Sequence, residues 1–177
     1  MSRLFGRIFQ ICWVVEDMEA AIIHWTRTMG VGPFVRFPIP LQAEWLEVRG
    51  QRIPQDNDIY RGVSISYSGD TMIELIQPGS DPSPYREFLA AGRQGAHHVG
   101  TYADDYDAQM AAARAAGIGV AMEGVLPLSR FAYLDTDTLW PGTMVELIEA
   151  GQDMHDYFGA IHEATRRWDG KEAVVSI

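Results

Sequence analysis

Two glutamates stand at the same position of a hexapeptide that the chain repeats almost without change. The sequence reads TMIELI at residues 71–76 and TMVELI at residues 143–148, with Glu74 and Glu146 inside otherwise apolar runs. Alternate residues of a strand share a face, so each glutamate shares its face with a methionine and an isoleucine. A carboxylate in such surroundings is costly unless it meets a cation or strong hydrogen-bond donors. The repeat therefore predicts two enclosed carboxylates that need such partners.

Two further polar residues occupy equivalent positions elsewhere in the repeat. Residues 9–20, FQICWVVEDMEA, match residues 97–108, HHVGTYADDYDA, in pattern, which aligns Gln10 with His98. One amide oxygen, one imidazole and two carboxylates form a plausible ligand set for a divalent ion, and such sites suit Mn²⁺, Fe²⁺, Co²⁺, Ni²⁺ or Mg²⁺. No thiolate aligns with the four residues, which argues against a structural zinc site. Cys12 shares a face with Gln10 and is expected to be a buried, inert thiol.

Both halves of the chain position these residues with the same order of elements. Each half starts with a strand-like run, reaches an acidic pair, and continues as an Ala-rich helix that stops at Gly30 or Gly117. Strand-like stretches follow near residues 33–38, 43–49, 59–67 and 71–77 in the first half, and near 118–124, 130–135 and 142–149 in the second. Each half therefore reads as strand, helix, and then about three strands.

The predicted boundaries divide the chain into four segments. These are a first βαβββ module at 1–80, a connecting loop and short helix at 81–93, a second βαβββ module at 94–150, and a C-terminal amphipathic helix and tail at 151–177. In the connector, Ser83 is the expected N-cap and Pro84 the first helical residue. The last segment carries an apolar stripe with spacings of three and four, which predicts packing on its own module or on a partner subunit.

The order of elements resembles the vicinal oxygen chelate superfamily, which includes glyoxalase I, extradiol dioxygenase, antibiotic-resistance and methylmalonyl-CoA epimerase families. The resemblance covers about residues 7–150, and the stretch MIELIQPGSDPSPYREFLAAGRQGAHHVG is most similar to the epimerase-like branch. It implies an α+β fold in which two tandem βαβββ modules form a curved mixed sheet cup, with the C-terminal helix in addition. It also implies a homodimer.

The resemblance gives the four aligned residues a function. The family's metal positions fall on Gln10, Glu74, His98 and Glu146; Gln10 stands where the family usually has histidine, and its amide oxygen is a weaker ligand. The implied protein is a metal-dependent isomerase, epimerase or lyase that transfers a proton next to a carbonyl through a metal-stabilised enolate. Glu146 is the first candidate for the catalytic base and Glu74 the second. Mn, Fe, Co, Ni, Mg and Zn are not distinguished as the ion.

The substrate is expected to be a small molecule that is aromatic or apolar, or an acyl-CoA. Aromatic residues are more numerous than a small methylmalonyl group requires. Glu44 or Glu47 could supply a second acid–base group, although both are ordinary surface residues by type. The alternative function is a metal-free protein that binds a drug or an apolar metabolite, with the four polar residues in an internal hydrogen-bonded network. An extradiol dioxygenase is disfavoured because it needs two histidines and one carboxylate, and Gln10 takes one histidine position.

Composition limits the remaining classes. The 177 residues, 47% of them hydrophobic, suffice for one domain or two small fused ones. A net charge of −10 argues against nucleic-acid binding, which needs a clustered basic surface. The single cysteine excludes a disulfide within the chain and fits a reducing compartment. No apolar run reaches the roughly 18 residues of a membrane span, and the N-terminus lacks a signal-peptide pattern, so the expected location is the cytoplasm.

Overall fold

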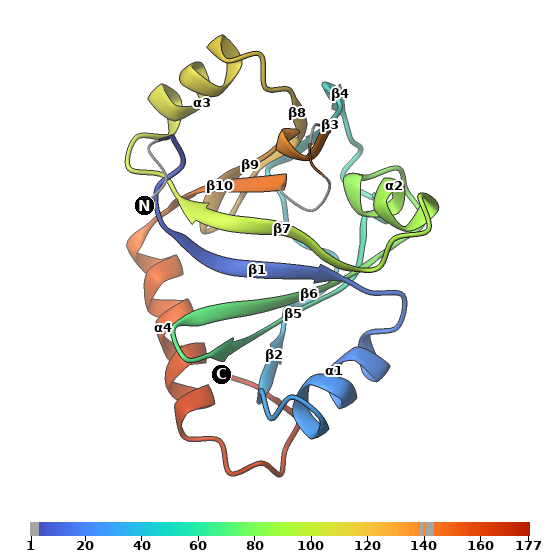
Figure 1. Ribbon diagram of the computed structural model, residues 1–177, viewed down its shortest axis with the longest axis vertical. Helices are drawn as coiled ribbons and strands as arrows, with labels where there is room; N and C mark the ends of the chain where they lie inside the picture. Colours follow the sequence, from blue (N-terminus) through green and yellow to red (C-terminus); the bar gives the residue numbers. More distant parts are fainter. Residues whose placement is uncertain (1–3, 139, 141–143) are drawn as a thin grey trace.

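The computed structural model describes residues 4–138, 140 and 144–177. Its strands are β1 (Ile8–Val14), β2 (Phe34–Arg36), β3 (Trp45–Val48), β4 (Gln51–Arg52), β5 (Tyr60–Ser68), β6 (Thr71–Pro78), β7 (Gly95–Tyr102), β8 (Val120–Leu126), β9 (Ser129–Leu134), β10 (Met144–Ala150) and β11 (Val174–Val175). Its helices are α1 (Met18–Arg27), α2 (Pro84–Ala90), α3 (Tyr106–Ala115), the short 3-10 helix η1 (Thr136–Thr138) and α4 (Gln152–Arg166). This mixed α+β architecture with a large curved sheet confirms the predicted fold class (Figure 1).

The predicted elements agree with the observed ones to within a few residues. The predicted stretch at 142–149 begins outside the described residues, and β10 is described from Met144 onward. Helix α2 begins as expected: Pro84 is its first residue, and the hydroxyl of Ser83 accepts a hydrogen bond from the backbone N–H of Arg86 at 3.2 Å. Local capping chemistry is therefore sufficient to place this connector helix.

The two halves of the sheet are related by the internal repeat. Strand β1 runs parallel to β6, β7 runs parallel to β10, and β1 meets β7 antiparallel at the centre of the sheet (Figure 1). Helix α1 covers the outer face of the first half, where Ile22 packs with Leu75. Helix α3 covers the outer face of the second half, where Met110 packs with Leu147. Because the helices occupy the outer faces, the inner faces of the four central strands are left for the site.

The hairpin β3–β4 crosses from the first half of the sequence to the second half of the sheet. Strand β3 pairs antiparallel with β8, with Trp45 opposite Val125, so the full order is β11-β2-β5-β6-β1-β7-β10-β9-β8-β3-β4. The turn consists of Arg49 and Gly50, whose φ angles are 51° and 74°. Two positive φ angles are what a tight two-residue hairpin needs. At the other edge, β11 pairs with β2 and covers it.

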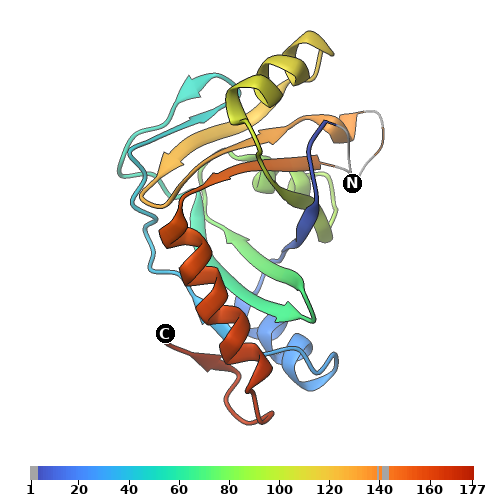
Figure 2. The same cartoon turned by 90° about the vertical axis from the view of Figure 1, so that its left-hand side faces the viewer.

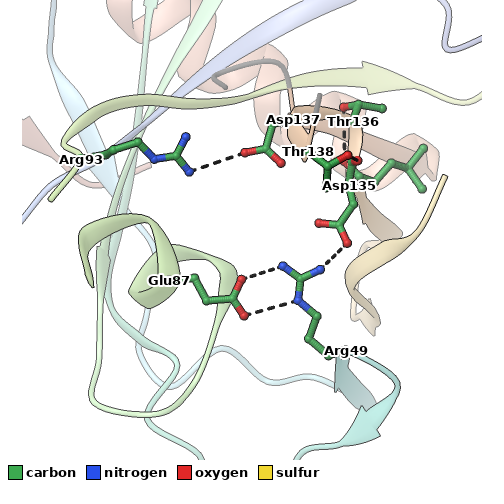
Figure 3. A network of polar contacts seen from close by, with 8 residues as sticks. Arg49, Glu87, Arg93, Asp135, Thr136, Asp137 and Thr138 are labelled. Carbon is green, nitrogen blue, oxygen red and sulfur yellow. Dashed lines mark hydrogen bonds and ion pairs between the residues drawn. The ribbon is translucent and has the colours of Figure 1, made fainter. Parts of the chain in front are cut away.

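An ion-pair network holds this hairpin to the connector helix (Figure 3). The guanidinium of Arg49 donates to Glu87 of α2, with the closer nitrogen and oxygen 2.6 Å apart, and also pairs with Asp135 after β9. Nearby, Arg93 and Asp137 form a longer pair of 3.6 Å. The network joins segments that lie far apart in the sequence: the β3–β4 hairpin, helix α2 and the segment after β9.

Helix α4 lies along the inner side of the sheet rather than outside it (Figure 2). It contacts β5 and β10, and its buried residues Phe158 and Ile161 join the hydrophobic cluster of the inner face. The predicted apolar stripe thus packs within its own chain. None of the described helices is long and apolar enough to cross a membrane.

Candidate functional site

The four polar residues singled out by the repeat meet on the inner face of the sheet. Glu74, Gln10, His98 and Glu146 come from the adjacent central strands β6, β1, β7 and β10, and each is at least nine-tenths buried. Their alternation with apolar neighbours places all four side chains on the same face, because successive residues of a strand point to opposite sides. The structure therefore brings together every member of the predicted set.

Short contacts join the four side chains. The amide nitrogen of Gln10 donates to Oε2 of Glu74 at 2.7 Å and lies 3.4 Å from Oε2 of Glu146. Nε2 of His98 lies 3.4 Å from Oε2 of Glu74 and 3.3 Å from Oε2 of Glu146. These two contacts are long, and His98 Nε2 has no well-directed hydrogen bond, although the residue is only 1% exposed. A buried imidazole nitrogen thus faces two carboxylates.

Gly100 makes room for the side chain of Gln10. It lies opposite Gln10 across the β1–β7 pair and opposite Glu146 across the β7–β10 pair. A Cβ atom at this position would lie 2.8 Å from the Oε1 of Gln10 and 2.9 Å from its Cβ. The glutamine side chain therefore extends over the glycine toward the two carboxylates, which only a residue without a side chain permits.

Cys12 is a fifth residue of the site. It lies opposite both Glu74 and His98 in the strand pairings, and its Sγ falls within 4.8 Å of a ligand atom of each. Burial, followed by the charge and hydrogen bond of Glu74, raises the pKa of its thiol well above the ordinary value. Cys12 is therefore a buried, neutral S–H group, as the sequence predicted, but it lies beside Glu74 and His98 rather than in purely apolar surroundings.

The charge state of the site follows from its burial and pairing. Burial alone lowers the pKa of His98, but the close, negatively charged carboxylates of Glu146 and Glu74 outweigh it and raise that pKa to about 9. Burial raises the pKa of the Glu146 carboxyl, and His98 opposes this effect. Without a bound cation, a protonated imidazole lies between the two carboxylates and balances part of their charge.

His97 sets the orientation of His98 from behind. Although the two residues are neighbours on a strand, their Nδ1 atoms lie 2.9 Å apart. Burial lowers the pKa of His97 to about 3, so its ring is neutral. One of the two Nδ1 atoms therefore donates to the other. Phe88 of α2 packs against the same ring.

A chain of three tyrosine hydroxyls leads to Glu146 and was not predicted. Tyr60 contacts Tyr85 at 3.2 Å and Tyr85 donates to Tyr133 at 2.9 Å, and the hydroxyl of Tyr133 acts to lower the pKa of the nearby Glu146 carboxyl. Burial raises the pKa of all three hydroxyls, so they remain neutral donors. Because each hydroxyl has one proton, the order of donation runs from Tyr60 toward the carboxylate. Tyr85 lies on the connector helix, which has no counterpart in the repeat, so the repeat gave no signal for it.

An inner cavity of about 90 Å³ opens above the carboxylates. Gln10, Glu74 and Glu146 are its charged or amide-bearing lining residues, and the rest of its wall is mostly apolar or aromatic. Glu44 and Glu47 do not line it: Glu44 is exposed, and Glu47 pairs with Arg52 at 3.1 Å on the hairpin. The second acid–base group suggested for these two glutamates is therefore not found at this cavity.

The donor set fits a divalent cation. Two carboxylates supply negative charge, and His98 has a buried ring nitrogen without a directed hydrogen bond. The amide of Gln10 presents its nitrogen to Glu74, and it would offer its oxygen to an ion after the amide turns over. These are hard or borderline ligands of the kind that first-row divalent ions prefer. Cys12 lies beside the set, but burial keeps its thiol protonated. The four predicted residues would hold such an ion, with the cavity above them open to a substrate.

Solved structures share this fold at low sequence identity. A protein from Bacillus halodurans C-125 superposes with a TM-score of 0.58 at 14% identity, over 82% of this chain and 95% of that one. A methylmalonyl-CoA epimerase from Mycobacterium tuberculosis gives 0.58 at 18% identity, over 88% and 95%. A Streptomyces coelicolor methylmalonyl-CoA epimerase variant in complex with 2-nitronate-propionyl-CoA gives 0.54 at 19%, over 84% and 96%. These similarities support the fold.

The sequence profile decides the family. No curated protein matches the chain by sequence. Residues 9–133, which carry both halves of the repeat up to β9, match the profile of one superfamily. With this match over most of its length and with the paired central strands described above, the chain belongs to the Glyoxalase/Bleomycin resistance protein/Dioxygenase superfamily.

Proposed function

We propose that this protein is a divalent-metal-dependent isomerase or epimerase that moves a proton on the carbon next to a carbonyl group. The observation that carries the proposal is the meeting of Gln10, Glu74, His98 and Glu146 beneath a mostly apolar cavity. The superfamily and the fold shared with methylmalonyl-CoA epimerases support it. An acyl thioester is the substrate class suggested by the names of those neighbours.

A divalent ion held by these four residues would supply a Lewis acid for the carbonyl oxygen of the substrate. The protein itself supplies the base. Glu146 lines the cavity and would accept the proton from the carbon next to the carbonyl, while the electron pair of that C–H bond moves toward the carbonyl oxygen. Return of a proton to the same carbon completes an isomerisation or epimerisation.

Glu146 is a better base than Glu74 because its partners hold it less tightly. Both carboxylates share the imidazole of His98, at 3.4 Å from Glu74 and 3.3 Å from Glu146. They differ at Gln10, whose amide donates a 2.7 Å hydrogen bond to Glu74 but lies 3.4 Å from Glu146. Glu74, which also lines the cavity, is the candidate for the group on the other side of the carbon.

The first experiment is elemental analysis of protein purified without a metal-affinity step. Wild type should contain Mn, Fe, Co, Ni or Zn in near-stoichiometric amount. Glu146→Gln should lose most of it, whereas Glu149→Gln should keep it, because Glu149 lies on the same strand but is exposed and paired with Arg130. A protein that stays metal-free after incubation with these ions overturns the proposal.

A second candidate function, ligand binding without a metal, has one observation in its favour. Gln10, Glu74, His98 and Glu146 already contact one another, with the amide donating to Glu74 and the imidazole between the carboxylates. Incubation with acyl thioesters and 2-oxo compounds in D2O separates the two functions. Solvent deuterium enters the carbon next to the carbonyl if the enzyme proposal holds, and it stays out if the site only binds.

A further inference from the structure

A second, larger cavity adjoins the site and opens to the surface. It has a volume of about 470 Å³ and lies between the loop at 37–42, the turn at 126–129 and helix α4. We refer to it as the outer groove. The outer groove and the inner cavity share Phe37, Leu41, Leu126, Ser129, Met154 and Phe158. These shared walls place the outer groove directly beside the inner cavity that contains the carboxylates.

The chemistry of the outer groove is apolar. Among the residues that the structure describes, its lining includes no Asp, Glu, Lys, Arg or His, and its polar groups are the side chains of Gln42, Ser129 and Tyr157. Ile39 and Leu128 on its wall are each 40% exposed. Large apolar side chains left open to water beside a site are typical of ligand-binding surfaces.

From this adjacency and the apolar lining we infer that the outer groove holds an uncharged aliphatic or aromatic arm of the substrate, whose carbonyl end reaches the four-residue site past the shared side chains. The inference rests on the proposed function for the position of the carbonyl. The inner cavity of about 90 Å³ has room for a small head only, so the bulk of a larger substrate has to lie in the groove. A phosphate-bearing arm is disfavoured there because none of the described lining residues is a cation that would pair with it.

The test uses the neutral fluorescent probe N-phenyl-1-naphthylamine. Wild type should bind it with enhanced, blue-shifted emission. Leu128→Asp places a charge on the groove wall and should weaken binding by about tenfold or more. Ile23→Asp is the matched control: Ile23 is 48% exposed on α1, away from the groove, and its replacement should leave the affinity within about twofold.

Competition with the fluorescent probe shows which kind of substrate arm the outer groove binds. A long-chain 2-oxo acid, 2-oxododecanoate, should displace the probe from wild type, whereas pyruvate and coenzyme A should not. The inference is overturned if wild type does not bind the probe, if Leu128→Asp binds it as well as wild type does, or if coenzyme A displaces it better than the long-chain acid does.

Metal content, measured on the same preparations, separates this inference from the proposed function. If wild type contains metal but binds no probe, the groove assignment fails and the enzyme proposal stands. If the probe binds and responds to Leu128→Asp while the protein takes up no metal, the groove assignment stands and the enzyme proposal fails. Leu128→Asp should itself retain wild-type metal content, because Leu128 does not line the inner cavity.

Discussion

Replacing Gly100 by alanine is the sharpest test of how the site is built. Gly100 lies opposite Gln10 in the pairing of β1 with β7. Its φ angle is not in the left-handed region, so the backbone alone does not require glycine. The limited space does require glycine, because the new methyl group would lie 2.9 Å from the Cβ of Gln10, whereas ordinary contacts begin at 3.4 Å.

The size of the effect follows from which atoms can move. The Cβ of Gln10 is bonded to the backbone, so no side-chain rotation relieves that contact, and the two central strands have to separate. Overpacking of this kind costs about 1–3 kcal/mol. A displaced Gln10 also deprives buried Glu74 of its donor, which adds about 1–3 kcal/mol, while replacing glycine by alanine in a strand returns about 0.5–1 kcal/mol. We expect the free energy of unfolding to fall by about 3 kcal/mol.

Urea unfolding followed by circular dichroism measures this change. The matched control is Gly159→Ala in α4, where a Cβ would meet no atom within 4 Å and helix propensity predicts a gain of about 0.5–1 kcal/mol. If Gly100→Ala lowers the free energy of unfolding by less than about 0.5 kcal/mol, the usual range of neutral substitutions, Gln10 does not cross over Gly100 as described.

Two further predictions concern contacts around the site. Arg49→Ala should lower the free energy of unfolding by about 1 kcal/mol at low salt and by less in 0.5 M NaCl, because partly exposed ion pairs are screened. The control is Arg61→Ala, which removes one exposed ion pair of 3.5 Å and should hardly change the free energy of unfolding. If both variants lowered the free energy of unfolding equally at both salt concentrations, the proposed role of the network would be wrong. Tyr85→Phe should cost about 1–3 kcal/mol in urea unfolding because it interrupts the buried hydroxyl chain, whereas Tyr157→Phe, half-buried on α4, should be nearly neutral. An undiminished stability of Tyr85→Phe would mean that the chain of hydroxyls is not formed.

The sequence predicted the core of the site because the repeat carries it. Strand alternation assigns Glu74 and Glu146 to equivalent faces, and aligned positions on the first strand of each half assign Gln10 and His98 likewise. The parallel pairing of β1 with β6 and of β7 with β10 then brings the four together. Two copies of one pattern thus predicted what a single copy could not.

Other parts of the site depend on packing that has no local signature. The apolar stripe of α4 predicts burial, but it does not indicate that Phe158 would enter the cup. The sequence indicates only that Tyr85 belongs to a short helix. Its hydroxyl contacts with Tyr60 and Tyr133 are visible only in the structure. The pairing of β3 with β8 could not be predicted either, because the pattern of a strand does not specify which strand lies next to it.

The crossing of the β3–β4 hairpin has a consequence for folding. Its pairing with β8 closes a contact between distant parts of the chain, and such non-local contacts slow folding. Neither half can complete its sheet alone, because the edge strand of the second half is encoded in the first. During refolding at high protein concentration, we expect β8 of another molecule to offer the hairpin the same partner, so that intertwined dimers compete with pairing within one chain.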